Sequence, residues 1–359
     1  TQLRGCVLIE GNVRVDSAGL RDLAGLEALH RITGSLEIVA GADSGLTSLR
    51  GLDNLECVSG DLTIGPDSGA GPLQTLRGLE RLRDVRALRV QNLPALESLQ
   101  GLSAVEEVER LEVVGCDSLA SLAGLDALRR VRGRLLLAHD ATLDSLYGAP
   151  RLQTVRELVV EDNASLESLQ GLPRELSELD ALSVERNAHL LTLDGLEALT
   201  RIQYLFVSDN PRLEQLAYFE QLRTLDSFEV ADHPQLTSLG DLPALEASAQ
   251  LELTLRNNTL LSSLRGLERV TQAYNVSVSG NAALSDLSDW RIQHVHNAML
   301  LSGNPSLITL DGLGALRDAA HLRVQANPRL RDLSGLSQLQ PGSVLELRNN
   351  PALQTASLQ

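Results

Sequence analysis

The sequence predicts a leucine-rich solenoid that is mainly β, right-handed, with one long parallel sheet and few regular helices. Three observations predict this fold class. A short stretch of alternating apolar residues recurs through all 359 residues, an asparagine follows most of these stretches, and the core is supplied by branched aliphatic side chains, with aromatic residues at only 2%. A fixed period over the whole chain is the mark of stacked coils.

The unit of the repeat is clearest at residues 158–172, LVVEDNASLESLQGL. Leu158 and Val160 alternate with Val159 and Glu161 as on a half-buried strand. Counting such strands gives about 15 coils, spaced 23 to 26 residues apart. Their first inward residues are Val13, Leu36, Leu62, Leu88, Leu111, Leu135, Leu158, Leu182, Leu205, Phe228, Leu253, Val276, Met299, Leu322 and Leu345. The spacing and pattern are those of the leucine-rich repeat.

An asparagine stands five residues after the inward leucine in many coils, where the chain leaves the strand. The column contains Asn163, Asn187, Asn210, Asn258, Asn281, Asn304, Asn327 and Asn350. A side-chain amide there can bond freed backbone groups of neighbouring coils, so we expect a ladder worth about 1 kcal/mol per rung. Cys116, Asp140 and His233 take this position in their coils, and we expect Cys116 to be a buried structural thiol.

The second half of each coil carries apolar residues at three-residue spacing, as at Leu193, Leu196, Leu199 and Ile202. This spacing predicts a tight, 3₁₀-like path instead of a long helix. A glycine before the second leucine is expected to allow a tight bend or a positive φ. Examples are Gly51, Gly78, Gly124, Gly195 and Gly312. Trp290 falls where other coils place a leucine, so we expect it in the core.

These patterns predict one elongated domain, with a cap at residues 1–12, repeats at 13–353 and a tail at 354–359. Two coils are lengthened by residues 40–45 and 65–72, which are rich in Gly, Pro, Ser and Asp and are expected to form solvated loops. Asp43 and Asp67 alone fall short of the roughly six to eight oxygens of a calcium site. The repeat stops at Leu353, so that end is expected to continue in the natural protein, or to meet a partner or a second copy.

The opening residues carry a more specific resemblance. The stretch CVLIEGNVRV at residues 6–15 and the following coils of the form LxxLxxVxGxLxI resemble the receptor L domain, which occurs in insulin and epidermal growth factor receptor ectodomains and in many bacterial surface proteins. The matching residues are Cys6, Ile9, Glu10, Gly11, Val13, Val15, Ile32, Gly34, Leu36, Ile38, Val58, Gly60, Leu62 and Ile64. The resemblance implies a secreted or cell-surface protein whose cap cysteine pairs with an upstream cysteine; this partner would precede Thr1.

Composition narrows the function. The net charge of −16 disfavours nucleic acid and anionic membranes as partners, and no apolar run is long enough for membrane insertion. All 31 basic residues are arginine, which is typical of a GC-rich bacterial genome; a selected lysine-free surface is the alternative. Three cysteines, Cys6, Cys57 and Cys116, leave at least one thiol without a partner in the chain.

The sequence contains no phosphate loop, zinc-spaced cysteine pair or nucleophile elbow, so we expect no catalytic, cofactor or metal residues. His294, His296 and His321 are the one histidine cluster. They could approach one another and hold a metal, but surface histidines are the favoured interpretation.

A ligand-binding face is predicted from the outward positions of the sheet. Their middle column becomes apolar near its centre, with acidic residues around it, as on a protein-binding surface. The candidate ligand-binding residues are Leu136, Val159, Tyr204, Phe206, Glu161, Glu185 and Glu229. The alternative is that β-branched and aromatic side chains simply favour sheets.

The leading functional hypothesis is a non-enzymatic recognition or adhesion module, secreted or on a bacterial cell surface, that binds a protein or peptide through the sheet face. The alternative is a structural protein that self-associates, through its C-terminal end or sheet edges, into a fibre or surface layer. An intracellular scaffold or inhibitor is a third possibility, and an enzyme comes last.

Overall fold

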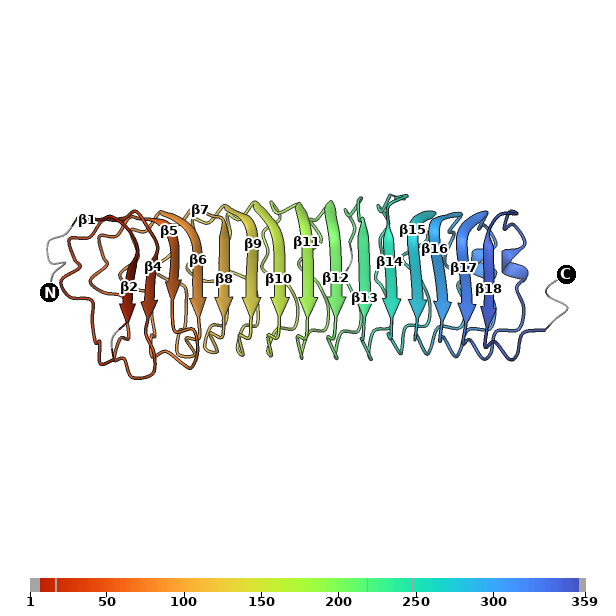
Figure 1. The fold of residues 1–359 in the computed structure, drawn as a ribbon, viewed down its shortest axis with the longest axis horizontal. Helices are drawn as coiled ribbons and strands as arrows, with labels where there is room; N and C mark the ends of the chain where they lie inside the picture. The colour runs from red at the N-terminus through yellow and green to blue at the C-terminus, as the bar shows by residue number, and fades with distance from the viewer. Residues whose placement is uncertain (1–6, 17, 218, 247, 355–359) are drawn as a thin grey trace. The chain divides into compact units, whose positions relative to one another are not determined.

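A computed structural model describes residues 7–16, 18–217, 219–246 and 248–354. The chain is a solenoid of about 15 coils whose strands pair in parallel (Figure 1). Its described residues contain no α-helix and two short 3₁₀ helices, η1 (Asp311–Leu313) and η2 (Ser334–Leu336). The predicted fold class is confirmed.

The chain groups into two compact units, Thr1–Leu179 and Asp180–Gln359. The single domain expected from the sequence stays a prediction. The strands of the first unit are β1 (Leu8–Ile9), β2 (Val13–Asp16), β3 (Arg31–Ile32), β4 (Leu36–Val39), β5 (Cys57–Ile64), β6 (Asp84–Gln91), β7 (Glu107–Val108), β8 (Arg110–Val114), β9 (Arg130–Ala138) and β10 (Thr154–Glu161). β11 (Glu178–Glu185) begins at the boundary. The strands after it are β12 (Arg201–Ser208), β13 (Ser227–Ala231), β14 (Glu252–Arg256), β15 (Gln272–Ser279), β16 (His294–Ser302), β17 (Asp318–Gln325) and β18 (Val344–Arg348).

The pairing of neighbouring strands confirms the predicted register. In the first unit, the paired inward residues run Val13, Leu36, Leu62, Leu88, Leu111, Leu135, Leu158. In the second, they run Leu205, Phe228, Leu253, Val276, Met299, Leu322, Leu345. Because side chains alternate along a strand, this register also fixes which residues face outward.

The core is a stack of leucine and valine rows. The three-residue spacing of the second half of each coil buries Leu193, Leu196, Leu199 and Ile202 almost completely. Trp290 is fully buried as predicted, and its indole N–H donates to the Val270 carbonyl at 3.0 Å. Few large side chains are needed, because each coil stacks the same small set of aliphatic residues on its neighbour.

The asparagine ladder is present. The backbone N–H of Asn281 donates to Oδ1 of Asn304 at 3.0 Å, and Nδ2 of Asn304 donates to the Val278 carbonyl of the preceding coil at 2.9 Å. The same bonds repeat at most of the column, whose asparagines are fully buried except Asn350 at the end. Each side-chain amide thus provides hydrogen-bond partners for backbone groups in the turn of one coil and in the strand of another.

The glycines of the coil bend behave as predicted, with one exception. Gly51, Gly78, Gly124 and Gly195 have φ between 107° and 115°. Gly312 does not have a positive φ, because it lies in η1, where the chain follows a 3₁₀ turn. There the glycine is needed for space instead, since a Cβ would lie 1.6 Å from the Leu287 carbonyl oxygen.

A second set of glycines occurs in the first coils, in the VxGxLxI pattern. Gly60 donates its N–H to the Gly34 carbonyl at 2.9 Å, and Gly34 donates to the Gly11 carbonyl at 3.1 Å. A Cβ on Gly34 or Gly60 would lie within 2.5 to 2.8 Å of the preceding coil's backbone. The pattern therefore marks a close backbone approach. Cys6 and its expected disulfide lie outside the described residues.

Candidate functional site

The middle outward row of the first unit begins with charges that pair with one another. Arg14 bonds Glu37 on the next strand, and Arg89 bonds Glu112 at 2.9 Å. The arginines of both pairs are about half exposed, so solvent screens the pairs and each contributes little to stability. This part of the face is a row of mutually satisfied charges and offers no apolar surface.

The same row then becomes apolar. Leu136 lies beside Val159, and Ala138 lies beside Val114 on the other neighbouring strand, as the register predicts. Leu136 and Val159 were expected to offer exposed apolar surface, but they are only 9% and 4% exposed. They are covered because they pack with Ala138 and the half-buried Val114 into a separate small cluster on the outer face.

The second unit carries an aromatic pair on the outward face of β12. The Tyr204 side chain is 51% exposed, and Phe206, two residues along the same face, is partly exposed. On the adjacent strand β13, Tyr204 is paired with Ser227 and Phe206 with Glu229. By contrast, Phe219, Phe228 and Trp290 are fully buried, so the pair differs from the aromatic residues that build the core.

The predicted acidic residues are all partly exposed, but they differ in their partners. Glu185 accepts from the Ser183 hydroxyl at 2.6 Å and pairs with Arg186 at 2.9 Å. Glu229 makes no ion pair among the described residues. Glu161 lies in the first unit, where it pairs in register with Ala138.

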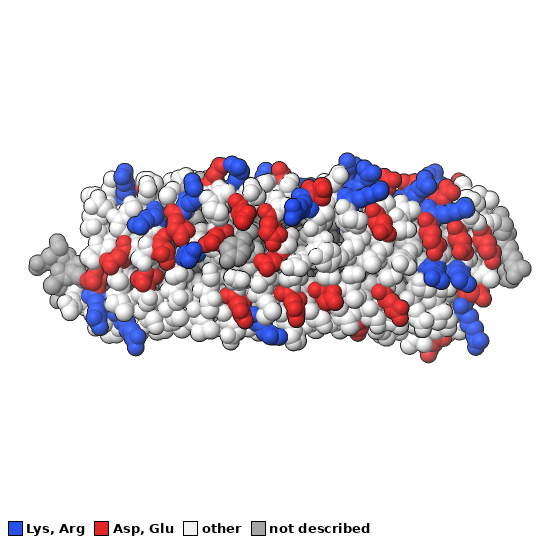
Figure 2. Space-filling model, turned by 180° about the vertical axis from the view of Figure 1, so that it is seen from behind, with Lys and Arg blue, Asp and Glu red and all other residues white. Residues whose placement is uncertain are grey.

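Figure 2 shows the face opposite the strands, where acidic side chains lie in short rows from coil to coil. Several carboxylates in the chain have a structural role that was not predicted from the sequence. Five accept the N–H of the glycine two residues earlier, as Glu80 does from Gly78 at 2.9 Å; the others are Glu27, Asp53, Glu197 and Glu268. The GLE or GLD triplet is the sequence signal for this bond, and these five carboxylates help to fix the bend of their coils.

Two of the three histidines of the predicted cluster lie together. His294 and His296 stack with ring centroids 6.5 Å apart, and Nδ1 of His294 lies 2.7 Å from Oδ2 of Asp318 on β17. This carboxylate was not predicted from the sequence. His321 lies in another row, beside Ala298. No group of three or more potential ligands occurs among the described residues.

Two ionisable side chains occupy rungs of the asparagine ladder. Oδ1 of Asp140 accepts the Cys116 N–H at 2.7 Å, but its buried Oδ2 has no partner. Burial raises the pKa of Asp140 to about 8, because it outweighs the hydrogen bond from the Cys116 N–H, which lowers the pKa. Burial lowers the pKa of His233, whose Nδ1 accepts the Asn210 N–H at 3.2 Å while Nε2 lies 3.1 Å from the Val207 carbonyl. Both side chains are neutral substitutes for asparagine.

Cys116 is fully buried beside this rung, and burial raises the pKa of its thiol. A protonated thiol without access to solvent is a poor nucleophile. The prediction of a buried thiol at this position is confirmed.

No protein-family model matches the chain, and no curated protein matches it. Among solved structures, it is similar to a chain of the glycosylated Toll–Spätzle complex of Drosophila, with a TM-score of 0.41 and 17% identity. The match covers 94% of this chain and 54% of the other, so this chain spans about half the length of that protein. Among the described residues, no helix has the length and apolar character required to cross a membrane.

Proposed function

We propose that this leucine-rich solenoid is a non-enzymatic recognition module that binds a protein or peptide through the outward face of its sheet. The observation that carries the proposal is the aromatic pair of β12. Tyr204 is half exposed and Phe206 partly exposed beside polar residues of β13, while the chain's tryptophan and its other two phenylalanines are fully buried. Exposed aromatic side chains of this kind are frequent anchors of protein interfaces.

The charges around the pair suggest the chemistry of the ligand. Glu229 lies directly beside Phe206, and Glu252 follows Ser227 in the row of Tyr204. We expect a ligand with an apolar residue that packs on the aromatic pair and basic residues that approach these carboxylates. In the first unit, Leu136 and Val159 are covered and are not part of the proposed surface, whereas Glu161 is partly exposed.

The proposal includes the cellular location of the protein. The resemblance of the first coils to the receptor L domain supports a secreted or cell-surface protein of bacterial origin. The glycines of that resemblance, Gly34 and Gly60, have the close backbone contacts described above.

The test is selection of binding peptides from a displayed library, followed by affinity measurements with Phe206→Glu and Tyr204→Ser. Each variant is expected to weaken the selected peptides about tenfold or more. Tyr274→Ser is the matched control, because Tyr274 is similarly exposed at 41% on another part of the chain. Equal losses with all three variants, or none with the β12 variants, would assign binding elsewhere.

Self-association is the second candidate function. It is favoured by the outward-facing Val344 on β18, an apolar side chain that is 49% exposed. An exposed apolar side chain on a sheet face can contact a second copy of the chain. Sedimentation velocity over a range of protein concentrations tests this candidate. The mass of the native chain should rise with concentration, and Val344→Asp should abolish this rise.

A further inference from the structure

The first unit has a hollow where several of its strands begin. It has a volume of about 670 Å³ and is lined by residues of β3, β5, β6, β7 and β9 and the turns before them. Pockets that hold ligands have volumes of roughly 300–1,000 Å³. The hollow is therefore large enough for several residues of a peptide.

Strand register places the lining side chains in rows. One row runs Arg31, Cys57, Asp84, Glu107, Arg130 on consecutive coils. The residues just before the last three form a second row, Arg83, Glu106, Arg129. Val58 and Val85 also line the hollow and are buried, so they add apolar side chains to its wall.

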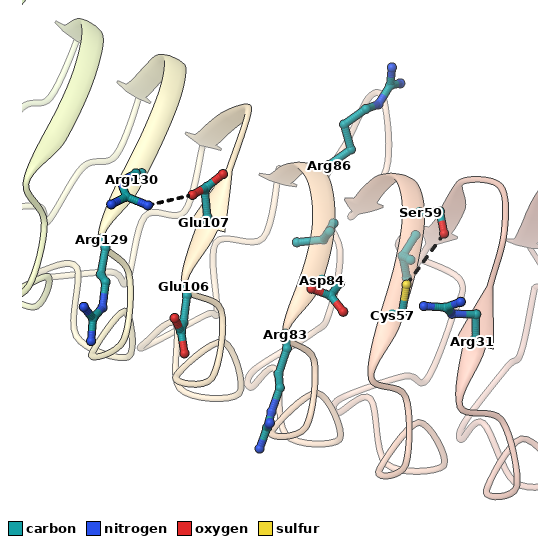
Figure 3. A pocket seen from close by; sticks show the side chains of 12 residues that line it. Arg31, Cys57, Ser59, Arg83, Asp84, Arg86, Glu106, Glu107, Arg129 and Arg130 are labelled. Atoms are coloured by element: carbon teal, nitrogen blue, oxygen red, sulfur yellow. Dashed lines mark hydrogen bonds and ion pairs between the residues drawn. The ribbon is translucent and has the colours of Figure 1, made fainter.

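The arginines of this groove fall into two groups. Arg130 pairs with Glu107 at 3.3 Å, and Arg86 pairs with Asp61 at 2.9 Å and points away from the others (Figure 3). Arg31, Arg83 and Arg129 make no ion pair among the described residues. Their guanidinium groups are therefore free to donate paired hydrogen bonds to a carboxylate or phosphate.

The spacing within the second row distinguishes between anionic ligands. Figure 3 shows Arg83, Glu106 and Arg129 extending side by side from three neighbouring coils. Arg83 and Arg129 are two strand spacings apart, about 9.6 Å. A peptide in the polyproline II conformation covers about 9.3 Å in three residues and brings the side chains of residues three apart to the same side. Glu106 lies between them and repels a negative charge at the midpoint. A uniform polyanion is disfavoured by this carboxylate and by the chain's net charge of −16, whereas a peptide can place acidic residues only at the arginines.

We propose that this arginine groove binds an acidic peptide segment whose carboxylates, about three residues apart, engage Arg83 and Arg129. Arg31, at the other side of the groove, receives a further acidic group such as a chain terminus. The groove is independent of the aromatic pair, so failure of either proposal leaves the other standing.

The test is fluorescence anisotropy at low ionic strength, where ion pairs are least screened. The probe is a short rhodamine-labelled alanine peptide with two glutamates three residues apart, and its glutamine counterpart is the reference. The double variant Arg83→Gln/Arg129→Gln is compared with Arg212→Gln/Arg329→Gln. The latter pair is a matched control, because both residues are exposed arginines of the second unit that make no ion pair among the described residues, and the net charge changes equally.

The groove variant is expected to weaken the glutamate peptide about tenfold or more, and the control pair to weaken it less than about twofold. Glu106→Gln is expected to strengthen binding, because it removes the repulsive charge. Circular dichroism verifies that each variant folds. Equal losses in both arginine pairs, no preference over the glutamine peptide, or tighter binding of pyrophosphate than of the peptide would overturn the proposal.

Discussion

At the residue scale, the most informative position is Asp140, because it shows what the ladder requires. Asn163 accepts a backbone N–H with Oδ1 and donates with Nδ2 to the Leu137 carbonyl at 3.0 Å. Asp140 reproduces the first bond, but its Oδ2 can reproduce the second only when it carries a proton. The carbonyl equivalent to that of Leu137 belongs to Val113, which pairs with Leu137. A buried carboxyl at this position is therefore stable only in the neutral form.

Asp140 makes stability depend on pH. Its pKa is about 8 in the folded chain, compared with 3.8 for an unperturbed carboxyl. The folded state therefore holds a proton that the unfolded state releases, and this contribution is present below pH 3.8 and lost as pH rises through 8. Within this window, the loss approaches about 1.4 kcal/mol per pH unit. The neighbouring groups are the Cys116 thiol and Asp117, and the charge of Asp117 acts in the same direction.

Asp140→Asn is expected to supply the missing donor, and thus to stabilise the chain increasingly from pH 5 to 9. Urea unfolding of both proteins at several pH values measures the difference. Glu97→Gln removes the same charge at an exposed position and should leave the pH profile unchanged. Parallel profiles for the native chain and Asp140→Asn would show that this carboxyl is ionised in the folded state.

At the scale of the coil, the bend before the second leucine depends on glycine for two reasons. Gly78 has a φ of 115°, and a Cβ there would lie 2.0 Å from the Leu49 carbonyl oxygen of the preceding coil. The Glu80 carboxylate caps its N–H. The positive φ and the close stacking of coils both require glycine, and the cap of its N–H requires a carboxylate two residues later. These requirements explain why the triplet GLE recurs.

Gly78→Ala is expected to destabilise the first unit by about 2–4 kcal/mol, because the strain of the positive φ adds to the steric overlap. Gly41→Ala is the matched control. Gly41 lies in a turn without a positive φ, and a Cβ there meets nothing within 4 Å, so alanine should change stability by less than about 1 kcal/mol. Thermal unfolding compares the two, and similar values would mean that the coils can separate to admit a methyl group.

Most of the coil could be predicted from the sequence because period, alternation and the asparagine position are each set by local chemistry. The inward register was correct in both units for this reason. The exposure of outward side chains could not be predicted in the same way. Leu136 and Val159 face outward but are covered, because burial depends on which side chains lie on the adjacent coils, some 23 residues away. The arginine groove was missed because its residues are consecutive only across coils.

At the scale of the whole molecule, a solenoid is stabilised by contacts between neighbouring coils, so damage should remain local. Leu158 is fully buried beside the equivalent Leu135, and Leu158→Asp would place a charge in that row. We expect hydrogen exchange to show loss of amide protection in β9 and β10, while β16 and β17 of the second unit remain protected. Glu157→Asp, on the same strand but partly exposed, should leave protection unchanged throughout. Uniform loss in all strands would mean that the chain unfolds as one cooperative body, and unchanged protection in β9 and β10 would refute the inward position of Leu158.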